Sequence, residues 1–168
     1  MTDLSLTQGS TANRQGRVLE NTIIPTFEAR GFEIVKYSDW KKKPNNYGTE
    51  LLLKHVPYTT IYGHRGYTEF LARSQRYNLN HRIECKWQQS SGSVDEKFPY
   101  LYLNCIEAMP EPNIIIIAGG GGMKEGAISW LKKVVLKQCY LPTDTVKKNI
   151  QVFSIEEFLL WANQTFRQ

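Results

Sequence analysis

Residues 82–88 read Arg-Ile-Glu-Cys-Lys-Trp-Gln, and in this stretch apolar and polar side chains alternate. Successive side chains of a β-strand point to opposite faces, so Glu84, Lys86 and Gln88 are predicted to share one face of a strand. The apolar side chains between them are predicted to face the core. This strand therefore presents a carboxylate, an ammonium group and an amide in a row.

A second acidic residue, Glu69, lies fifteen positions before Glu84, in the segment Gly-Tyr-Thr-Glu-Phe-Leu-Ala at residues 66–72. That segment also reads as a strand, and a charge within it is costly unless it is paired or binds a metal. Adjacent strands would bring the two carboxylates together, and a hard divalent cation such as Mg²⁺ would relieve their repulsion. Lys86 would then stand beside the ion, where it orients or helps to deprotonate a water molecule and stabilises charge on a phosphate.

The other segments predict an α/β domain with a central mixed β-sheet flanked by helices. Helices are expected at 13–30, 94–108 (capped by the turn at 90–93), 124–138 and after Ser154, which forms a capping box with Glu157. Further strands are expected at 32–37, 50–55, 58–62, 113–118 and 150–153, with a loop at 41–48. We expect residues 1–12 to form a flexible N-terminal tail and residues 13–168 to form a single domain.

The composition of the chain limits the class of protein to which it can belong. The chain has 168 residues, is 41% hydrophobic and carries a net charge of +5, which favours polyanionic partners. It has no apolar run near 20 residues and no signal-peptide-like start, so we expect no membrane contact and a cytoplasmic location. Its three cysteines show no CxxC spacing, which argues against structural zinc and for reduced, buried thiols.

An acidic residue followed by Glu-x-Lys on the next strand resembles the PD-(D/E)XK nuclease superfamily, which includes many restriction endonucleases and Holliday-junction resolvases. The resemblance covers roughly residues 13–153 and implies a restriction-endonuclease-like core. It implies that Mg²⁺, for which Mn²⁺ can substitute, is held by Glu69, Glu84 and the backbone carbonyl of Cys85. Lys86 would act on the attacking water.

Three further features match the superfamily. Glu20 on the first predicted helix corresponds to a glutamate that often supports the metal site, and Gln88 extends the motif to ExKxQ. Lys97, at the helix start after the motif, could meet a phosphate. One feature departs from the pattern: the first acid is usually Asp, so Glu50 or Asp39 stays an alternative to Glu69.

The resemblance implies a Mg²⁺-dependent endonuclease acting on DNA, of type II restriction or phage origin. Duplex DNA is the expected partner, and a two-fold homodimer is the simplest way to cut both strands. The basic residues expected to contact DNA are Lys41, Lys42, Lys43, Arg65, Arg73 and Lys97.

Two other functions compete with this one. The first is a non-catalytic DNA-binding module on the same fold. The second is a nucleotide-binding protein that uses the glycines at 119–122, but that run lacks the spacing of known phosphate-binding loops. We expect the run to be a turn that lets the backbone pass close to the next helix, with contact to a DNA phosphate as the alternative, and we expect no nucleotide cofactor.

Overall fold

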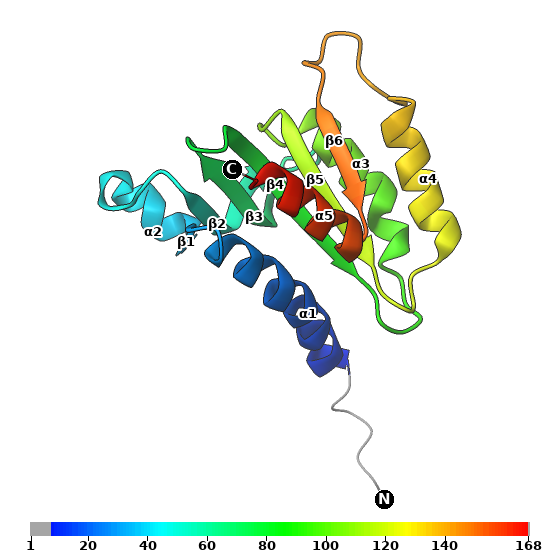
Figure 1. Ribbon diagram of the computed structural model, residues 1–168. Coiled ribbons are helices and arrows are strands. Elements are labelled where there is room, and N and C mark those ends of the chain that lie inside the picture. The colour runs from blue at the N-terminus through cyan, green and yellow to red at the C-terminus, as the bar shows by residue number, and fades with distance from the viewer. Residues whose placement is uncertain (1–7, 168) are drawn as a thin grey trace, which may run out of the picture.

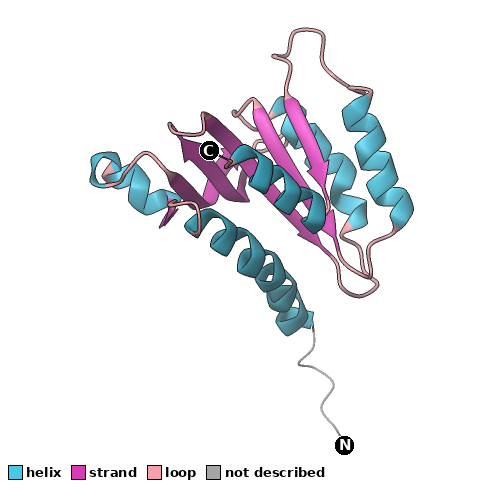
Figure 2. Cartoon of the chain, viewed as in Figure 1, coloured by secondary structure: helices cyan, strands magenta, loops and turns pink. Residues whose placement is uncertain are grey.

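The computed structural model describes residues 8–167, and for residues 8–16 and 18 it describes the backbone alone. Six strands form one mixed sheet in the order in which they occur along the chain (Figures 1 and 2). The central pairs β2–β3 and β3–β4 are antiparallel, and the outer pairs are parallel. The strands are β1 (Glu33–Lys36), β2 (Leu51–Thr59), β3 (Arg65–Ser74), β4 (Leu79–Trp87), β5 (Asn113–Gly119) and β6 (Asn149–Phe153).

Helices cover both faces of this sheet, as the sequence predicts for an α/β fold. The helices are α1 (Gln8–Glu28), α2 (Tyr37–Lys42), α3 (Phe98–Glu107), α4 (Glu125–Leu136) and α5 (Ile155–Thr165), with short 3₁₀ turns η1 (Pro44–Asn46) and η2 (Asp95–Lys97). In Figure 1, α1 and α5 lie in front of the sheet, and α3 and α4 lie behind β5 and β6. One apolar cluster joins α1 and α5 to the sheet, and a second joins α3 and α4 to its other face.

Strand β4 shows the predicted alternation. Ile83 and Cys85 belong to the cluster beneath α1 and α5. Arg82 and Glu84 point to the opposite face and are nevertheless buried, with 1% and 5% of their surface exposed. Because charged side chains are rarely buried without partners, this face of β4 is a candidate for a functional site.

Strands β3 and β4 pair along only half of their length. Their ladder runs from Ser74↔Leu79 to Phe70↔Ile83 and stops there. Beyond that point β3 continues beside β2 only, while β4 continues beside β5 as far as Trp87. The sheet therefore opens at Glu69 and Glu84, the first residues past the last pair.

Three segments differ from their predicted structure. Helix α1 begins at Gln8, so residues 8–12, expected in the tail, form its first turns, and residues 1–7 lie outside the described residues. Residues 41–48 were predicted to be loop, but α2 extends to Lys42 and η1 follows. The break expected at Pro57 is absent, because β1 pairs with β2 only as far as Lys54 and the missing N–H of Pro57 faces no neighbour on that side.

The two predicted helix caps have different outcomes. Ser154 accepts a hydrogen bond from the backbone N–H of Glu157, and the Glu157 carboxylate accepts one from the backbone N–H of Ser154, which confirms the capping box. The turn at 90–93 does not cap α3 directly, since η2 intervenes and no side chain caps that helix. No described helix is long and apolar enough to cross a membrane.

Candidate active site

Glu69 and Glu84 meet where the sheet opens. The Glu69 carboxylate accepts a hydrogen bond of 3.0 Å from the backbone N–H of Cys85. This N–H belongs to β4, just past the point where β3 and β4 stop pairing. The hydrogen bond holds Glu69 beside the ExK segment. The charge of Glu69 raises the pKa of Glu84, which shows that the two predicted acids lie close together.

The Glu84 carboxylate is almost fully buried. One of its oxygens accepts a hydrogen bond from the Lys86 ammonium group, and its other oxygen, Oε2, is buried without a hydrogen-bond partner. Burial first, and then repulsion from Glu69, raise the pKa of Glu84 to about 8, although Lys86 opposes the shift. Lys86 therefore partners one Glu84 oxygen, and Oε2, close to a second acid, is left without a donor or a cation.

Lys86 is a cation at neutral pH. Burial alone would lower its pKa, but the Glu84 and Glu69 carboxylates outweigh burial and raise the pKa above its ordinary value. Of the two roles expected for this residue, the structure fits the orienting and charge-stabilising role, because a protonated amine donates hydrogen bonds and does not accept a proton.

All four charged residues of the predicted site act electrostatically on Cys85. Burial is the main cause that raises the pKa of the Cys85 thiol, and the Glu69 and Glu84 carboxylates raise it further. Lys86 lowers this pKa, and Glu20 makes a smaller contribution that raises it. Glu20 reaches this region because Leu19 and Ile23 of α1 pack into the core beneath β4. Its carboxylate lies 3.9 Å from the Lys54 ammonium group, and its side chain is 44% exposed.

Gln88 is buried and holds the end of β4. Its amide nitrogen donates to the carbonyl of Gly122, and its amide oxygen accepts from the backbone N–H of Val94. A side chain at Gly120 would overlap the backbone of Gln88, and one at Gly122 would overlap that of Ser90. The glycine run thus permits a close backbone approach, but to the segment after β4 and not to the next helix.

The alternative first acids lie elsewhere. Glu50 binds the side chain of Ser74, at the end of the β3–β4 hairpin away from Glu84, and its carboxylate also accepts from Thr49. Asp39 is exposed on α2 and lies 3.9 Å from Lys42. Neither carboxylate shares the environment of Glu84, whereas Glu69 does.

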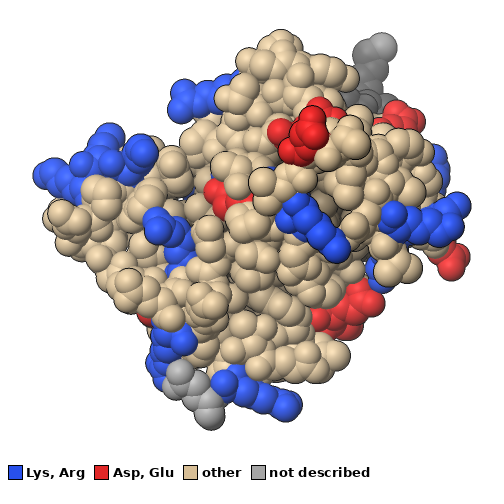
Figure 3. Space-filling view, turned by 90° about the horizontal axis from the view of Figure 1, so that it is seen from above, with Lys and Arg blue, Asp and Glu red and all other residues tan. Residues whose placement is uncertain are grey.

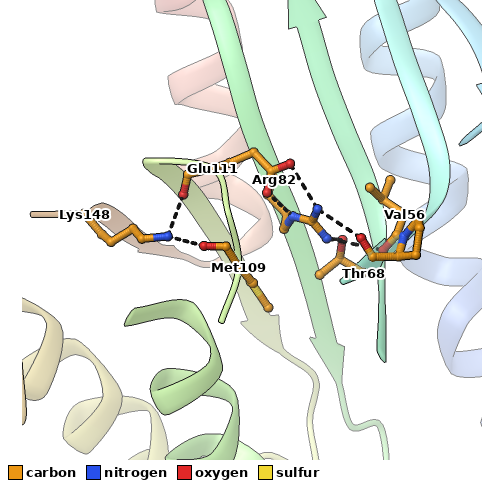
Figure 4. A network of polar contacts seen from close by, with 7 residues as sticks. Val56, Thr68, Arg82, Met109, Glu111 and Lys148 are labelled. Atoms are coloured by element: carbon orange, nitrogen blue, oxygen red, sulfur yellow. Dashed lines mark hydrogen bonds and ion pairs between the residues drawn. The ribbon is translucent and has the colours of Figure 1, made fainter. Parts of the chain in front are cut away.

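The sequence interpretation assigned no role to Arg82, which is the centre of a buried polar network. The Arg82 guanidinium pairs with Glu111 and donates to the hydroxyl of Thr68 and to the carbonyls of Val56 and Pro57 (Figure 4). It thereby connects β4 to β2 and β3 at the place where β3 and β4 separate. The ammonium group of Lys148 extends the network, donating to the backbone carbonyls of Met109 and Glu111.

Tyr58 is the second residue that the sequence did not identify. Its ring lies 5.5 Å from the Arg82 guanidinium. Burial, with the Glu84 carboxylate next in importance, raises the pKa of Tyr58 to about 12, so its phenol is a hydrogen-bond donor at neutral pH. Only its place in space, beside Glu84 and Lys86, marks it as part of the site.

The basic residues expected to contact DNA do not form one patch. Lys41, Lys42 and Lys43 are exposed at the end of α2, and Lys97 is exposed in η2. Arg65 and Arg73 stand near opposite ends of β3 and approach the aromatic rings of Tyr67 and Trp40 respectively. Figure 3 shows Lys and Arg in separate groups spread over one face, including a group at the left, the side on which α2 lies in Figure 1.

The donor set suits a divalent cation bound mostly by water and substrate. Among the described residues no group of three or more His, Cys, Asp or Glu could form a full protein cage. Mg²⁺ needs only one or two carboxylates, with water and phosphate oxygens completing its shell. The unpartnered Oε2 of Glu84 beside Glu69 therefore fits such an ion.

Comparison with known proteins agrees with this geometry. A family model described as a PD-(D/E)XK nuclease superfamily domain matches residues 11–166. Comparison with curated proteins and with solved structures gave no significant match. The matched region contains Glu20, Glu69 and the ExK strand, and the six-stranded mixed sheet flanked by helices is consistent with a restriction-endonuclease-like fold. The chain therefore belongs to the PD-(D/E)XK nuclease superfamily, which supports a nuclease-like function.

Proposed function

We propose that the protein is a Mg²⁺-dependent endonuclease that hydrolyses phosphodiester bonds of DNA. The observation that carries the proposal is the pair of converging carboxylates, Glu69 and Glu84, with the Lys86 ammonium group held against the buried one. A buried charge cluster of this kind is expensive to keep in a fold. Its cost is consistent with a catalytic role.

Glu69 and Glu84 would hold the cation, with the backbone carbonyl of Cys85 as a third ligand. When bound, the ion supplies Lewis-acid polarisation of a phosphoryl oxygen and lowers the pKa of a coordinated water. The hydrogen bond from the Cys85 N–H keeps Glu69 oriented toward β4. Burial of Glu84 excludes bulk water from one side of the site, which strengthens electrostatic interactions there.

Lys86 would orient the attacking water and stabilise negative charge on the phosphate, because it carries a full positive charge beside both acids. Tyr58 can donate a hydrogen bond toward the same region. Glu20 and Gln88 support the site in different ways. Glu20 adds negative charge near Cys85, and Gln88 fixes the end of the strand that carries Glu84 and Lys86.

DNA is the proposed substrate, as the net charge of +5 and the exposed lysines near α2 suit a polyanion. A duplex has two strands and each protomer supplies one such site, so we propose a two-fold homodimer for double-strand cleavage. The size of the chain suits either a type II restriction enzyme or a phage-encoded nuclease.

The test is cleavage of supercoiled plasmid and several genomic DNAs in Mg²⁺ or Mn²⁺. Glu84→Gln and Lys86→Met should each reduce the rate by at least about 100-fold while the far-ultraviolet circular dichroism stays unchanged. Glu156→Gln and Lys133→Met are matched controls, since both side chains are exposed and lie on other elements. Equal cleavage by wild type and both site variants would refute the proposal.

A further inference from the structure

A cavity of about 320 Å³ lies between α2, β2 and β3. It is lined by Tyr37, Ser38, Lys41, Pro57 and three residues that form a stack: His55, Arg65 and Tyr67. We call it the aromatic pocket. Tyr67 precedes Glu69 by two residues on β3, which is about 7 Å along the strand.

The stack inside the pocket has a defined geometry. The rings of His55 and Tyr67 are parallel within 8°, with centroids 3.9 Å apart. The Arg65 guanidinium lies 5.6 Å from the Tyr67 centroid. Tyr67 remains 42% exposed, and His55 and Arg65 are exposed as well. The pocket thus offers an open aromatic surface bordered by two cations, Arg65 and Lys41.

The backbone is bent out of a regular strand to make this stack. His55 has a φ of 57°, a left-handed conformation that is uncommon for a residue other than glycine. The inward alternation of β2 shifts at this point: Leu53 and Val56, three residues apart, pack into the same cluster. Residues with a strained backbone cluster at functional sites.

Core packing does not account for the stack. His55, Arg65 and Tyr67 belong to none of the three apolar clusters of the described residues. The same arrangement suits a flat ligand that carries negative charge, because an aromatic face stacks on a base and cations contact phosphate.

We propose that the aromatic pocket binds one unpaired base of the nucleic-acid substrate, which stacks on the His55–Tyr67 pair while Arg65 and Lys41 contact neighbouring phosphates. The inference rests on the proposed function and adds a substrate preference to it. A base must be unstacked from its neighbours to enter such a pocket. The protein should therefore prefer single-stranded or locally opened nucleic acid at this position.

The test is fluorescence anisotropy with a fluorescein-labelled dT 12-mer, the same strand paired with its dA complement, and a fully abasic 12-mer. EDTA is present so that no strand is cut. Tyr67→Leu should weaken binding of the dT 12-mer about tenfold or more, the loss expected for one stacked base, while Tyr67→Phe binds like wild type. His55→Asn should give the same loss, and asparagine tolerates the left-handed backbone, so this variant should melt no earlier than wild type.

The abasic 12-mer should bind wild type and both weakened variants equally. Tyr62→Leu is the matched control, because Tyr62 is exposed but stacks on Tyr100 and does not line the pocket. If Tyr67→Leu and His55→Asn bind the dT 12-mer as wild type does, the inference is overturned. The inference is also overturned if these variants lose as much affinity for the abasic 12-mer as for the dT 12-mer. Such a result would mean that the pocket contacts only phosphates.

A plasmid assay with the same protein variants, in Mg²⁺ and without EDTA, separates the two proposals. Suppose that cleavage requires Glu84 but the pocket variants bind the strands as wild type does. This result overturns the proposal for the aromatic pocket and leaves the nuclease proposal standing. A wild-type protein that neither binds the strands nor cleaves overturns both.

Discussion

Removing Glu111 should destabilise the protein strongly, although this residue is far from both carboxylates in sequence. Glu111 neutralises Arg82, whose side chain is 2% exposed, and Glu111 itself is 11% exposed. Removing one partner of a buried ion pair typically costs about 3–5 kcal/mol, because the other charge remains in a poorly solvated place. Arg82 would keep three oxygen acceptors, on Val56, Pro57 and Thr68, so we expect the lower end, about 3 kcal/mol, for Glu111→Ala.

The assay is urea denaturation followed by circular dichroism, with the free energy of unfolding taken from linear extrapolation. The double variant Arg82→Met with Glu111→Leu should recover most of the loss, since an apolar pair leaves no unpaired charge. As the control, Lys132→Ala breaks an exposed ion pair with Glu157 and should cost about 0.5 kcal/mol or less. A cost below about 1 kcal/mol for Glu111→Ala, or strictly additive effects of the two changes, would refute this reasoning.

Two more predictions concern the glycine run and the last helix. Gly120→Ala should destabilise by about 3 kcal/mol or more, because φ is 107° and a Cβ would overlap Gln88, whereas Gly126→Ala in open space on α4 should be neutral or stabilising in the same urea titration. The hydrogen bond from the Ser154 N–H holds the pKa of Glu157 below its ordinary value, so its stabilising contribution is present above the pKa of the unfolded chain and is lost as pH falls through the folded value. The melting temperature of wild type should fall between pH 5 and pH 3, and that of Glu157→Gln should fall by about 2–4 °C less over the same range. Identical pH profiles of the two proteins would contradict this assignment.

The site strand was predictable because a single local rule determines it. Alternation along residues 82–88 is enough to separate the core face from the polar face, and the buried Ile83 and Cys85 follow. The capping box at Ser154 is equally local, since its two hydrogen bonds span three residues. Glu69 could be chosen because a charge stood in an otherwise mostly apolar strand.

Other features depended on contacts between distant segments. In the sequence Arg82 looks like any other basic residue. Only the fold shows that it pairs with Glu111, twenty-nine positions later. Tyr58 became part of the site only because the fold places it where Glu84 acts on it, and the left-handed backbone of His55 has no sequence signal comparable to a glycine. Gln88 was recognised as an extension of the ExK motif, but the sequence did not show that its amide binds the backbone of Gly122 and Val94.

The central claim is that Glu69 and Glu84 together bind a divalent cation, and calorimetric titration of the protein with Mn²⁺ at pH 7.5 tests it without relying on cleavage. Wild type and the exposed-site control Glu156→Gln should bind with the same affinity. Glu84→Gln, which keeps the shape of the side chain but removes its charge, should bind at least about tenfold more weakly, as should Glu69→Gln. Unchanged affinity in both site variants would contradict the account.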